Sequence, residues 1–303
     1  MNKTAAIILT YNRKEILKNC VDAVLGQKTS VKPDVIVVDN GSTDGTKLMF
    51  EGHEAFYTHD KVRYYNTGAN TGCAGGFSFG MRKAAELGYD YVWIMDDDCI
   101  PSETAFAALY DYAAANAGGF GFLCSKVLWK DGSISIINVP RETLIRNVKD
   151  MNRSVIPVTM ASFASLFIPI SVIKDVGLPY REFFIWTDDW EYTRRISAKY
   201  PCFFITDSIV THYIKVNSKA DISSAAEDRL HRFRYLYRND VVLYRREGLK
   251  GFAYEAARLP YHLIRIALSR HSLKEKKRRA GILINGTIEG LGFYPTPERL
   301  PEK

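Results

Sequence analysis

The sequence predicts an α/β fold: a mixed, mainly parallel sheet flanked by helices, followed by a helical C-terminal extension. Three observations lead to this prediction. Short apolar segments alternate with segments of helical periodicity as far as Asn116, polar side chains follow the predicted strands, and the last quarter of the chain is basic, aromatic and helical in pattern. Alternating strands and helices favour a parallel sheet, because right-handed crossovers place the helices on its two faces.

The expected elements follow in order along the chain. Apolar, β-branched runs predict strands at residues 5–9, 34–39, 62–65 and 91–95. Apolar residues at helical spacing predict helices at residues 16–25, 77–87 and 102–116. Beyond Phe120 the pattern is mixed, with strand-like segments at 120–128, 155–168 and 203–205 and a helix at 188–198. From Asp228 onward the chain is expected to be helical, with a break at Pro260.

Composition excludes several classes of protein. The 303 residues are 47% hydrophobic and 25% charged, which is ordinary for a globular protein with one large domain and a smaller appendage. No apolar run approaches the roughly 18–20 residues that span a bilayer, and the N-terminus reads as a first strand, without signal-peptide architecture. The five cysteines form no C-x-x-C pair, which argues against a disulfide framework or a zinc site and suits a reducing cytoplasm.

The net charge of +7 is concentrated near the C-terminus. From Arg229 to Arg279 the chain has 15 Lys and Arg against 4 Asp and Glu. Such a block can meet nucleic acid, an anionic membrane surface or a phosphorylated substrate, or it can be a solvated helical face.

The acidic run Asp96-Asp-Asp98 directly follows a predicted strand. On an extended chain Asp96 and Asp98 point to the same side, where two carboxylates can chelate a hard divalent cation. Such a cation can bridge two phosphate oxygens and stabilise a diphosphate leaving group. Helix capping by Asp98, or simple strand termination, is the alternative, but neither explains three adjacent like charges.

Two further polar segments follow strands. Asp39, at the tip of the second strand, can accept a hydrogen bond from the imide N–H of uracil or thymine, although a plain strand-to-helix loop is an equal alternative. The glycine-rich segment 66–76 permits close backbone approach, and the next helix presents its amides to an anion. Its spacing is not G-x-G-x-x-G, so alone it is a weak signal.

Acidic and aromatic residues gather again at 184–195. Asp188 and Asp189 open a predicted helix, where acidic residues favour the helix dipole. The flanking Trp186 and Trp190 suggest the walls of a sugar site, in which a carboxylate can deprotonate an acceptor hydroxyl. His212 follows a strand; a lone histidine there is more often structural, but together with Asp98 it becomes a candidate metal ligand.

In this order the motifs resemble the family 2 inverting glycosyltransferases with a GT-A fold, most of all the bacterial galactofuranosyl- and rhamnosyltransferases of surface polysaccharide synthesis. The resemblance runs from Ala5 to Tyr213 and continues more faintly through Arg234-Tyr-Leu-Tyr-Arg-Asn239. It implies Asp189 as the catalytic base with Asp188 beside it, and Asp98 and His212 as ligands of Mn²⁺ or Mg²⁺. The residues that it implies for the nucleotide-sugar site are Thr10, Asn12, Arg13, Asp39, Asn70, Gly75, Gly76, Asp96, Asp97 and Trp186. Within the acidic run, Asp97 is expected to turn away and support the other two.

The resemblance also implies a donor. It favours UDP-galactofuranose, with dTDP-rhamnose or another UDP-hexose as alternatives. The galactofuranosyl pattern has Trp directly before the paired carboxylates, whereas Thr187 intervenes here, so whether Asp188 or Asp189 is the base stays open.

Two regions are expected, a catalytic domain over residues 1–225 and a basic helical region over 226–303. Acceptors in this family are often carried on lipid diphosphates. The helical region is therefore expected to rest on the anionic inner face of the bacterial plasma membrane, through Phe252, Leu259, Leu263 and Ile266, or else to form a homo-oligomer. The protein itself would be cytoplasmic and peripheral to that membrane.

Other classes of protein fit the sequence less well. A nucleotidyltransferase normally has a glycine-rich loop after its first strand, where this chain has Thr10-Tyr-Asn-Arg13. A nucleic-acid-binding protein would leave the acidic segments unexplained, so no nucleic acid partner is expected. An inactive sugar-binding module is a third alternative, which donor turnover would exclude.

Overall fold

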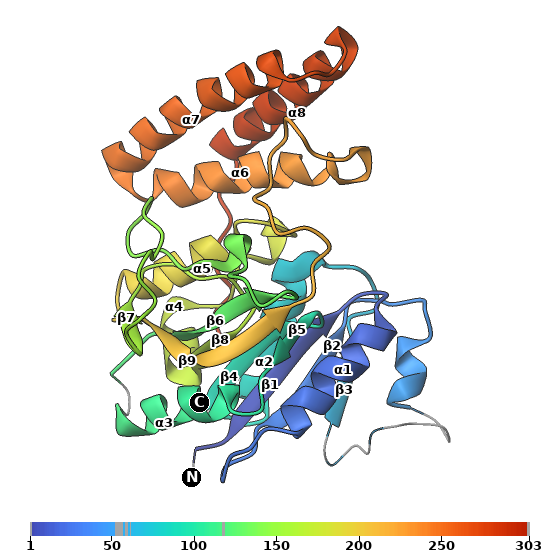
Figure 1. Ribbon diagram of the computed structural model, residues 1–303, viewed down its shortest axis with the longest axis vertical. Helices are drawn as coiled ribbons and strands as arrows, with labels where there is room; N and C mark the ends of the chain where they lie inside the picture. Colours follow the sequence, from blue (N-terminus) through green and yellow to red (C-terminus); the bar gives the residue numbers. More distant parts are fainter. Residues whose placement is uncertain (1, 52–56, 58–59, 61, 117–118, 302–303) are drawn as a thin grey trace.

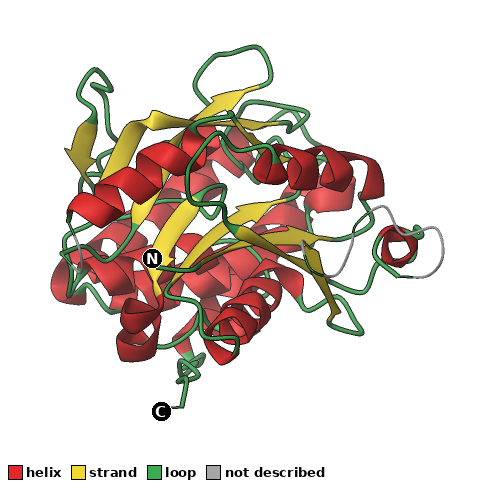
Figure 2. Cartoon of the chain, turned by 90° about the horizontal axis from the view of Figure 1, so that it is seen from below, coloured by secondary structure: helices red, strands yellow, loops and turns green. Residues whose placement is uncertain are grey.

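The computed structural model describes residues 2–51, 57, 60, 62–116 and 119–301. In these residues nine strands form a single sheet in the order β3-β2-β1-β4-β8-β6-β9-β5, with β7 paired to β9 (Figure 1). Helices cover both faces of the twisted sheet (Figure 2). Three long C-terminal helices form a separate layer beyond it (Figure 1).

The first half of the sheet is parallel, as predicted. Its strands are β1 (Thr4–Thr10), β2 (Asp34–Asp39), β3 (Val62–Asn66) and β4 (Tyr91–Asp96). They alternate with α1 (Lys14–Leu25) and α2 (Gly72–Glu86), and α3 (Ala105–Ala115) follows. The β-branched runs Val35-Ile-Val-Val38 and Ile7-Ile8 form central strands because both faces of each strand are buried.

Side chains of β1 divide between two cores, since successive residues of a strand point to opposite faces. Ile7 and Leu9 pack in the cluster that contains α2, α4 (Ile170–Val176) and α5 (Asp188–Ser197). Ala6 and Ile8 pack in the cluster that contains α1 and α3. The sheet is therefore covered on both faces, which confirms the predicted layering.

The second half of the sheet differs from the prediction. Its strands are β5 (Cys99–Pro101), β6 (Leu123–Trp129), β7 (Val155–Pro157), β8 (Leu166–Pro169) and β9 (Phe203–His212). The single strand expected at 155–168 is wrong: β7 ends at Pro157, which has no N–H for a ladder, and β8 begins nine residues later beside β4. β9 runs on to His212 instead of ending at Ile205, and the unexpected β5 pairs with its end.

α2 begins at Gly72, five residues before the expected Phe77. The prediction missed this part because glycine has a low helix propensity and the first turns of α2 are rich in glycine. The packing against β1 requires these glycines. A Cβ at Gly76 would lie 2.3 Å from Leu9 Cδ1, and one at Gly80 would lie 2.6 Å from Ile7 Cγ2.

The C-terminal helices are α6 (Arg232–Arg245), α7 (Gly248–Leu268) and α8 (Leu273–Leu291). The break expected at Pro260 is wrong, since α7 continues through it. An interior proline removes one helical hydrogen bond and costs about 3 kcal/mol. Contacts with α6 and α8 on both sides of Pro260 offset this cost: Tyr254 packs on Tyr244, and Leu263 and Ile266 pack in a cluster with residues of both helices. None of the described helices is long and apolar enough to cross a bilayer.

Beyond α8 the chain returns to the sheet domain. The N–H of Leu178 donates to the carbonyl of Glu298 at 2.8 Å, and the Glu298 carboxylate accepts from Arg82 at 2.5 Å. Leu300 is buried in the same core cluster as α2 and α4. The C-terminus thus lies in the lower half of the molecule, away from α7 (Figure 1).

Candidate active site

Polar residues end all four parallel strands at one edge of the sheet. Thr10 pairs in register with Asp39, and Asp39 pairs with Asn66. Asp96 ends β4 opposite Leu9 of β1. The polar ends of these strands therefore lie along one rim, at the edge where open α/β sheets bind ligands.

Asp39 is fully buried at this rim. Its Oδ2 accepts hydrogen bonds from the Tyr64 hydroxyl at 2.6 Å and from Asn66 Nδ2 at 3.3 Å, and its Oδ1 accepts from the Ser42 N–H at 2.7 Å. A carboxylate has about four acceptor positions, so it retains capacity for one more N–H. Tyr64 and Asn66 hold this carboxylate in place. Asn66 opens the glycine-rich segment singled out in the sequence, whereas no motif pointed to Tyr64.

Asparagine side chains organise the loops around Asp39. Asn12, at φ 54°, accepts the N–H of Thr43 at 2.7 Å and so joins the end of β1 to the end of β2. Asn70 accepts the N–H of Gly72 at 2.9 Å where α2 begins. Gly75 and Gly76 lie inside α2 and are buried. Beside the rim a hollow of about 370 Å³ is lined by Asn12, Arg13, Lys14, Glu15, Ile16 and Asp44.

Arg13 neutralises much of the acidic run. Its guanidinium lies 3.2 Å from Asp97 Oδ1 and 2.6 Å from Asp98 Oδ2, and the Thr10 hydroxyl donates to Asp97 Oδ2 at 2.7 Å. The chain turns after Asp96, so the run is not the extended segment from which parallel Asp96 and Asp98 side chains were predicted. Asp97 faces β1 and supports the run.

Burial and charge separate the pKa values of the run. Burial raises the pKa of Asp97 to about 7 against the opposing effect of Arg13. Burial, together with the charge of Asp98, raises the pKa of Asp96 to about 6. Burial acts in the same direction on Asp98, but its partners His212 and Arg13 outweigh it and hold the pKa of Asp98 below the ordinary value.

Strand pairing brings Asp98 and His212 together. Cys99 pairs in register with His212, which places the Asp98 carboxylate next to the imidazole. His212 Nε2 lies 3.2 Å from Asp98 Oδ1, and both side chains are buried. The Cys99 thiol is also near, and burial raises its pKa well above the ordinary value. One carboxylate oxygen and one imidazole nitrogen fit Mn²⁺ or Mg²⁺, whereas a cysteine sulfur is a soft ligand that these cations bind less readily.

Asn138 fixes the orientation of His212. Its amide nitrogen donates to Ser162 Oγ at 2.8 Å, and its Oδ1, 2.8 Å from His212 Nδ1, accepts from that nitrogen. Nε2 then faces Asp98, the direction in which a cation held by both residues would lie. Asn138 lies in an irregular segment with no motif, so nothing in the sequence pointed to it.

Asp188 and Asp189 begin α5, as predicted, in different surroundings. Asp188 is buried, and its Oδ2 has no hydrogen-bond partner among the described residues. Burial, with the neighbouring Asp189, raises the pKa of Asp188 well above its ordinary value. Asp189 is partly exposed and accepts the Trp190 N–H at 2.7 Å; burial raises its pKa to about 7. Near neutral pH Asp189 is therefore the member of the pair that ionises.

A positively charged side chain, that of Arg141, lies near Asp189. The Arg141 guanidinium lies 4.4 Å from the centre of the Trp190 ring, and its charge opposes the rise in the pKa of Asp189. Trp186 packs edge-on against Phe233 at 4.9 Å and is partly exposed. Arg141, like Asn138, lies in the irregular segment and was not predicted.

The five residues before Asp188, Phe183–Thr187, form a strained segment that we call the base loop. Phe184, Trp186 and Thr187 have φ values of 64°, 65° and 67°. Residues other than glycine avoid this region, and each such position costs about 1–3 kcal/mol. Surrounding contacts must hold the loop in this conformation, and such strain concentrates at functional sites.

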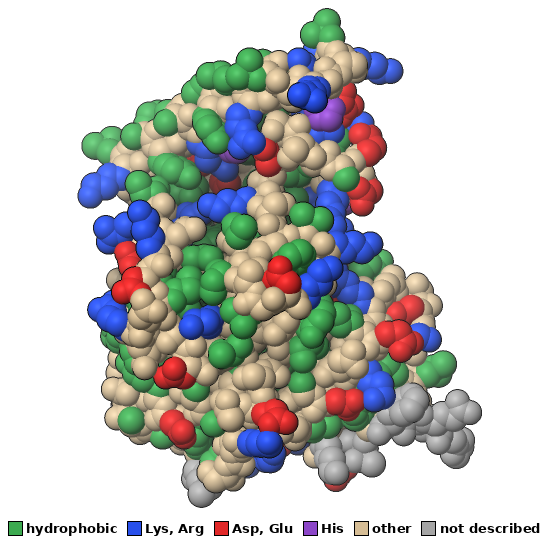
Figure 3. Space-filling model, viewed as in Figure 1, with side chains coloured by type: hydrophobic (Ala, Val, Ile, Leu, Met, Phe, Trp, Pro, Cys, Tyr) green, Lys and Arg blue, Asp and Glu red, His purple; other side chains and the backbone are tan. Residues whose placement is uncertain are grey.

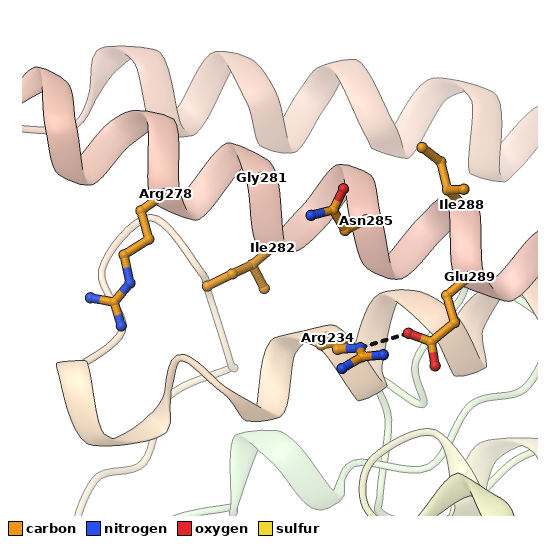
Figure 4. Close-up of a pocket in the computed structure, with 7 residues that line it drawn as sticks. All are labelled: Arg234, Arg278, Gly281, Ile282, Asn285, Ile288 and Glu289. Carbon is orange, nitrogen blue, oxygen red and sulfur yellow. Dashed lines mark hydrogen bonds and ion pairs between the residues drawn. The ribbon is translucent and has the colours of Figure 1, made fainter.

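A second hollow lies on the C-terminal helices. It has a volume of about 560 Å³ and is lined by Arg234, Arg278, Gly281, Ile282, Asn285, Ile288 and Glu289 (Figure 4). Arg234 pairs with Glu289 at 2.6 Å and Arg278 pairs with Glu227, so both guanidinium charges are neutralised. The hollow contains none of the predicted site residues.

Comparison with known proteins identifies the fold. The family model described as "Glycosyl transferase family 2" matches residues 5–172. The galactofuranosyltransferase GlfT1 of Mycolicibacterium smegmatis is 38% identical over 100 residues, which cover 33% of this chain and 31% of that protein. GlfT1 of Mycobacterium tuberculosis is 27% identical over 198 residues, 63% of either chain. The chain thus spans less than two thirds of the length of these relatives.

Solved structures agree with this assignment. GalNAc-T7, crystallised with UDP, GalNAc and Mn²⁺, superposes with a TM-score of 0.66 at 14% identity, covering 92% of this chain and 54% of that one. Residues 1–349 of S. aureus TarS in complex with UDP give a TM-score of 0.52 at 14% identity, covering 93% and 71%. At such identities the likeness shows the fold alone, and it confirms the predicted GT-A architecture.

Proposed function

Because the chain belongs to glycosyl transferase family 2, we propose that it moves a hexose from a nucleotide-sugar donor to a glycan or lipid-diphosphate-linked acceptor with inversion at the anomeric carbon. The observation that carries this proposal is the arrangement of two acidic sites. One, at the rim of the parallel strands, fits a nucleoside diphosphate. The other, Asp189, is an ionisable carboxyl group with a pKa of about 7 at the start of α5.

The proposed donor is UDP-galactofuranose. The likeness to the two galactofuranosyltransferases supports it, as do the UDP molecules in GalNAc-T7 and TarS. Buried Asp39 is suited to accept the imide N–H of uracil. Since thymine offers the same N–H, dTDP-rhamnose remains the alternative donor, and another UDP-hexose is the second.

The residues divide the reaction between them. Ionised Asp189 takes the proton of the acceptor hydroxyl as that oxygen attacks the anomeric carbon. Asp188, whose pKa burial raises well above the ordinary value, stays neutral and adds no negative charge near the base. Asp98 and His212 would hold Mn²⁺ or Mg²⁺, which supplies positive charge to the departing diphosphate. Arg13 adds a fixed positive charge on the same side.

The test is turnover of a panel of UDP- and dTDP-sugars with Mn²⁺ or Mg²⁺, read as released nucleoside diphosphate. We expect one donor to be consumed, and Asp189→Asn to lower the rate by about 10²–10⁴-fold while UDP binding is retained. Asp111→Asn, on the exposed surface of α3, is the matched control. Transfer by Asp189→Asn at near the wild-type rate would remove Asp189 as the base, and no turnover of any donor would contradict the proposed function.

We further propose that α7 rests on an anionic membrane that presents the acceptor, which would make the protein cytoplasmic and peripheral. The four residues expected to meet lipid are corrected by the structure: Leu259, Leu263 and Ile266 pack inward, and only Phe252 faces out. The outward apolar side chains of α7 are Leu249, Phe252, Tyr261, Ile264 and Leu268.

The surroundings of this apolar face favour lipid over a second copy of the chain. Exposed residues of α7 include Lys250 and Arg265, the latter ion-paired with Asp221, and no acidic residue. Two more exposed basic residues, Arg270 and Lys274, follow α7 in the sequence. Figure 3 shows the hydrophobic side chains along the outer edge of α7, with basic groups near them. Apolar side chains with a basic border match the boundary of an anionic bilayer.

A further inference from the structure

The base loop cannot hold its own conformation. Phe184, at φ 64° and ψ −63°, makes a tight γ-turn in which the N–H of Ile185 donates to the Phe183 carbonyl at 2.7 Å. This form of γ-turn is rare and strained. Trp186 and Thr187 are also left-handed, so the segment has no regular ladder, and its carbonyl groups need partners from elsewhere.

α6 supplies most of these partners. Asn239, which is fully buried, directs its amide nitrogen at the carbonyl oxygens of Phe183, Ile185 and Trp186, at 3.0, 3.2 and 2.8 Å. The neighbouring Arg238 donates to the carbonyls of Glu182 and Phe183 at 2.6 and 3.3 Å. The one remaining carbonyl before Thr187, that of Phe184, accepts the Ala74 N–H of α2 at 3.2 Å.

A second link leads from the loop into α7. The Thr187 hydroxyl donates to Asp240 Oδ1 at 2.5 Å, and the other Asp240 oxygen is ion-paired with Arg258 of α7. Thr187 and Asp240 are both buried. Arg258 thereby compensates the charge of Asp240. It also fixes the Asp240 side chain, whose Oδ1 accepts from Thr187, the residue immediately before Asp188.

The side chains of the loop also pack on α6. Tyr235 stacks on Phe184 at 5.1 Å between ring centres, and Phe233 meets Trp186 edge-on at 4.9 Å. These aromatic residues and Arg238-Asn239 belong to, or adjoin, the Arg234–Asn239 motif. The proposed chemistry gives that motif no direct role.

We propose that Asn239 and Asp240 of α6 are positioning residues for the transfer reaction: they hold the base loop in its left-handed conformation and so fix where Asp188 and Asp189 stand. Only the identity of the reaction rests on the proposed function. The C-terminal helices are then part of the catalytic apparatus, and Thr187, the residue that departs from the galactofuranosyl pattern, is the anchor for Asp240.

Two substitutions test this arrangement in the full chain. Asn239→Ala removes the donor shared by three carbonyls. Thr187→Val removes a single hydroxyl at nearly constant volume, and Thr187→Ser restores it, so this pair keeps the test valid if Asn239→Ala folds poorly. Asn285→Ala, an exposed position on α8, is the control. Each variant is studied by hydrogen–deuterium exchange, by titration with UDP and Mn²⁺, and by kcat and KM over a range of pH.

We expect amide exchange over residues 183–191 to accelerate about tenfold or more in Asn239→Ala and Thr187→Val, with exchange in β1 and β2 unchanged. Displacing a base by about 1 Å lowers rates by roughly 10²-fold, so kcat should fall by about 10–100-fold while the Kd for UDP changes less than twofold. The acid limb of the kcat profile, expected near pH 7 from Asp189, should move. Thr187→Ser should regain the wild-type limb and most of kcat.

Two results would overturn the proposal. The first is unchanged exchange over residues 183–191 in both variants. The second is a fall in kcat in proportion to the fraction of protein that no longer binds UDP, with the acid limb of the kcat profile unmoved. A general loss of folded protein would give this result. If exchange rises as expected but the wild-type protein consumes no donor, the loop contacts stand and the proposed function fails.

Discussion

Asp188 and Asp189 are adjacent in the chain, yet their environments give them different chemistry. Asp188 is buried with an oxygen that lacks a partner among the described residues, whereas Asp189 is partly exposed and accepts a backbone N–H. Two like charges this close do not ionise together readily, so the more exposed group ionises first. For the proposed transfer reaction, Asp189 is therefore the better candidate for the base, a choice that the sequence left open.

Burial of Asp188 has a consequence for stability. Its folded pKa is raised above the ordinary 3.8, so above that pH the unfolded chain loses this proton while the folded chain keeps it, and stability falls as pH rises. Asp188→Asn, which carries no charge, should raise the melting temperature, and by more at pH 8 than at pH 4. Thermal unfolding at both pH values measures this, with Asp111→Asn as the exposed control. An equal change at the two pH values would contradict it.

The orientation of His212 depends on a residue that does not touch the proposed cation. Asn138→Ala removes the acceptor at Nδ1 and frees the ring to rotate or change tautomer. We expect the Kd for Mn²⁺ to rise about 10–100-fold, as is usual for such partners. Calorimetric titration with Mn²⁺ measures it, and Asn116→Ala, at an exposed position, serves as the control. Affinity within twofold of wild type would show that Asn138 does not set the site.

The candidate site residues that the sequence pointed to are side chains whose type and position along the chain suggest a chemical role. Asp39, Asp98 and Asp189 are carboxylates at the ends of strands or the start of a helix. Their supporting partners lie far away in sequence: Asn138 is 74 residues from His212, and Thr187 meets Asp240 across 53. Tertiary folding alone brings such pairs together, so no local pattern could indicate them.

Among the elements, α2 is the one whose start depends most on contacts beyond itself. Gly72, its first residue, has φ +73°, and a Cβ there would lie 2.0 Å from the Phe184 carbonyl oxygen. The first turn of α2 therefore sits directly against the base loop. Glycine here serves a close approach between two backbone segments.

Gly72→Ala should destabilise the protein through both strain and collision. Gly68, at φ +81°, isolates the strain of the left-handed backbone, because a Cβ added there would meet no atom within 4 Å. We expect Gly68→Ala to cost about 1–2 kcal/mol, and Gly72→Ala to cost about 1–3 kcal/mol more through overpacking. Urea unfolding of the two variants compares them. Equal free energies of unfolding would show that α2 and the base loop move apart freely.

Elements were predictable where burial imposes a simple pattern. The central strands β1, β2 and β4 are apolar on both faces, and each was located to within one or two residues. β5 and the end of β9 were missed because strand pairing, more than composition, determines where they stop. α7 passed through Pro260 because packing against two neighbouring helices outweighs the local penalty of one proline.

At the scale of the whole molecule, the outer face of α7 tests the proposed membrane contact. Replacing exposed Phe252 and Leu268 by Ser removes apolar area without touching the core. We expect this double variant to lose most binding to vesicles containing anionic lipid at low salt, and the wild type to bind neutral vesicles weakly. Vesicle sedimentation measures both, with Leu48→Ser, 69% exposed on the catalytic domain, as the control. A dimer that the double variant abolishes, without vesicle binding, would favour self-association.

The sheet domain and the layer of helices α6, α7 and α8 contact each other through more than one segment. The base loop is held by α6, and the chain beyond α8 packs against α2 and α4. Hydrophobic periodicity cannot reveal this return, because the final segment has no regular secondary structure.

Because Leu300 is part of the core of the sheet domain, the order in which the chain is synthesised affects how that core can form. The ribosome makes β1 first, yet the core that contains Ile7 also contains Leu300, which is made almost 300 residues later. A nascent chain that has already formed its parallel strands therefore still exposes an apolar gap beside α4. This part of the core can therefore close only after the helical layer and residue 300 have been translated.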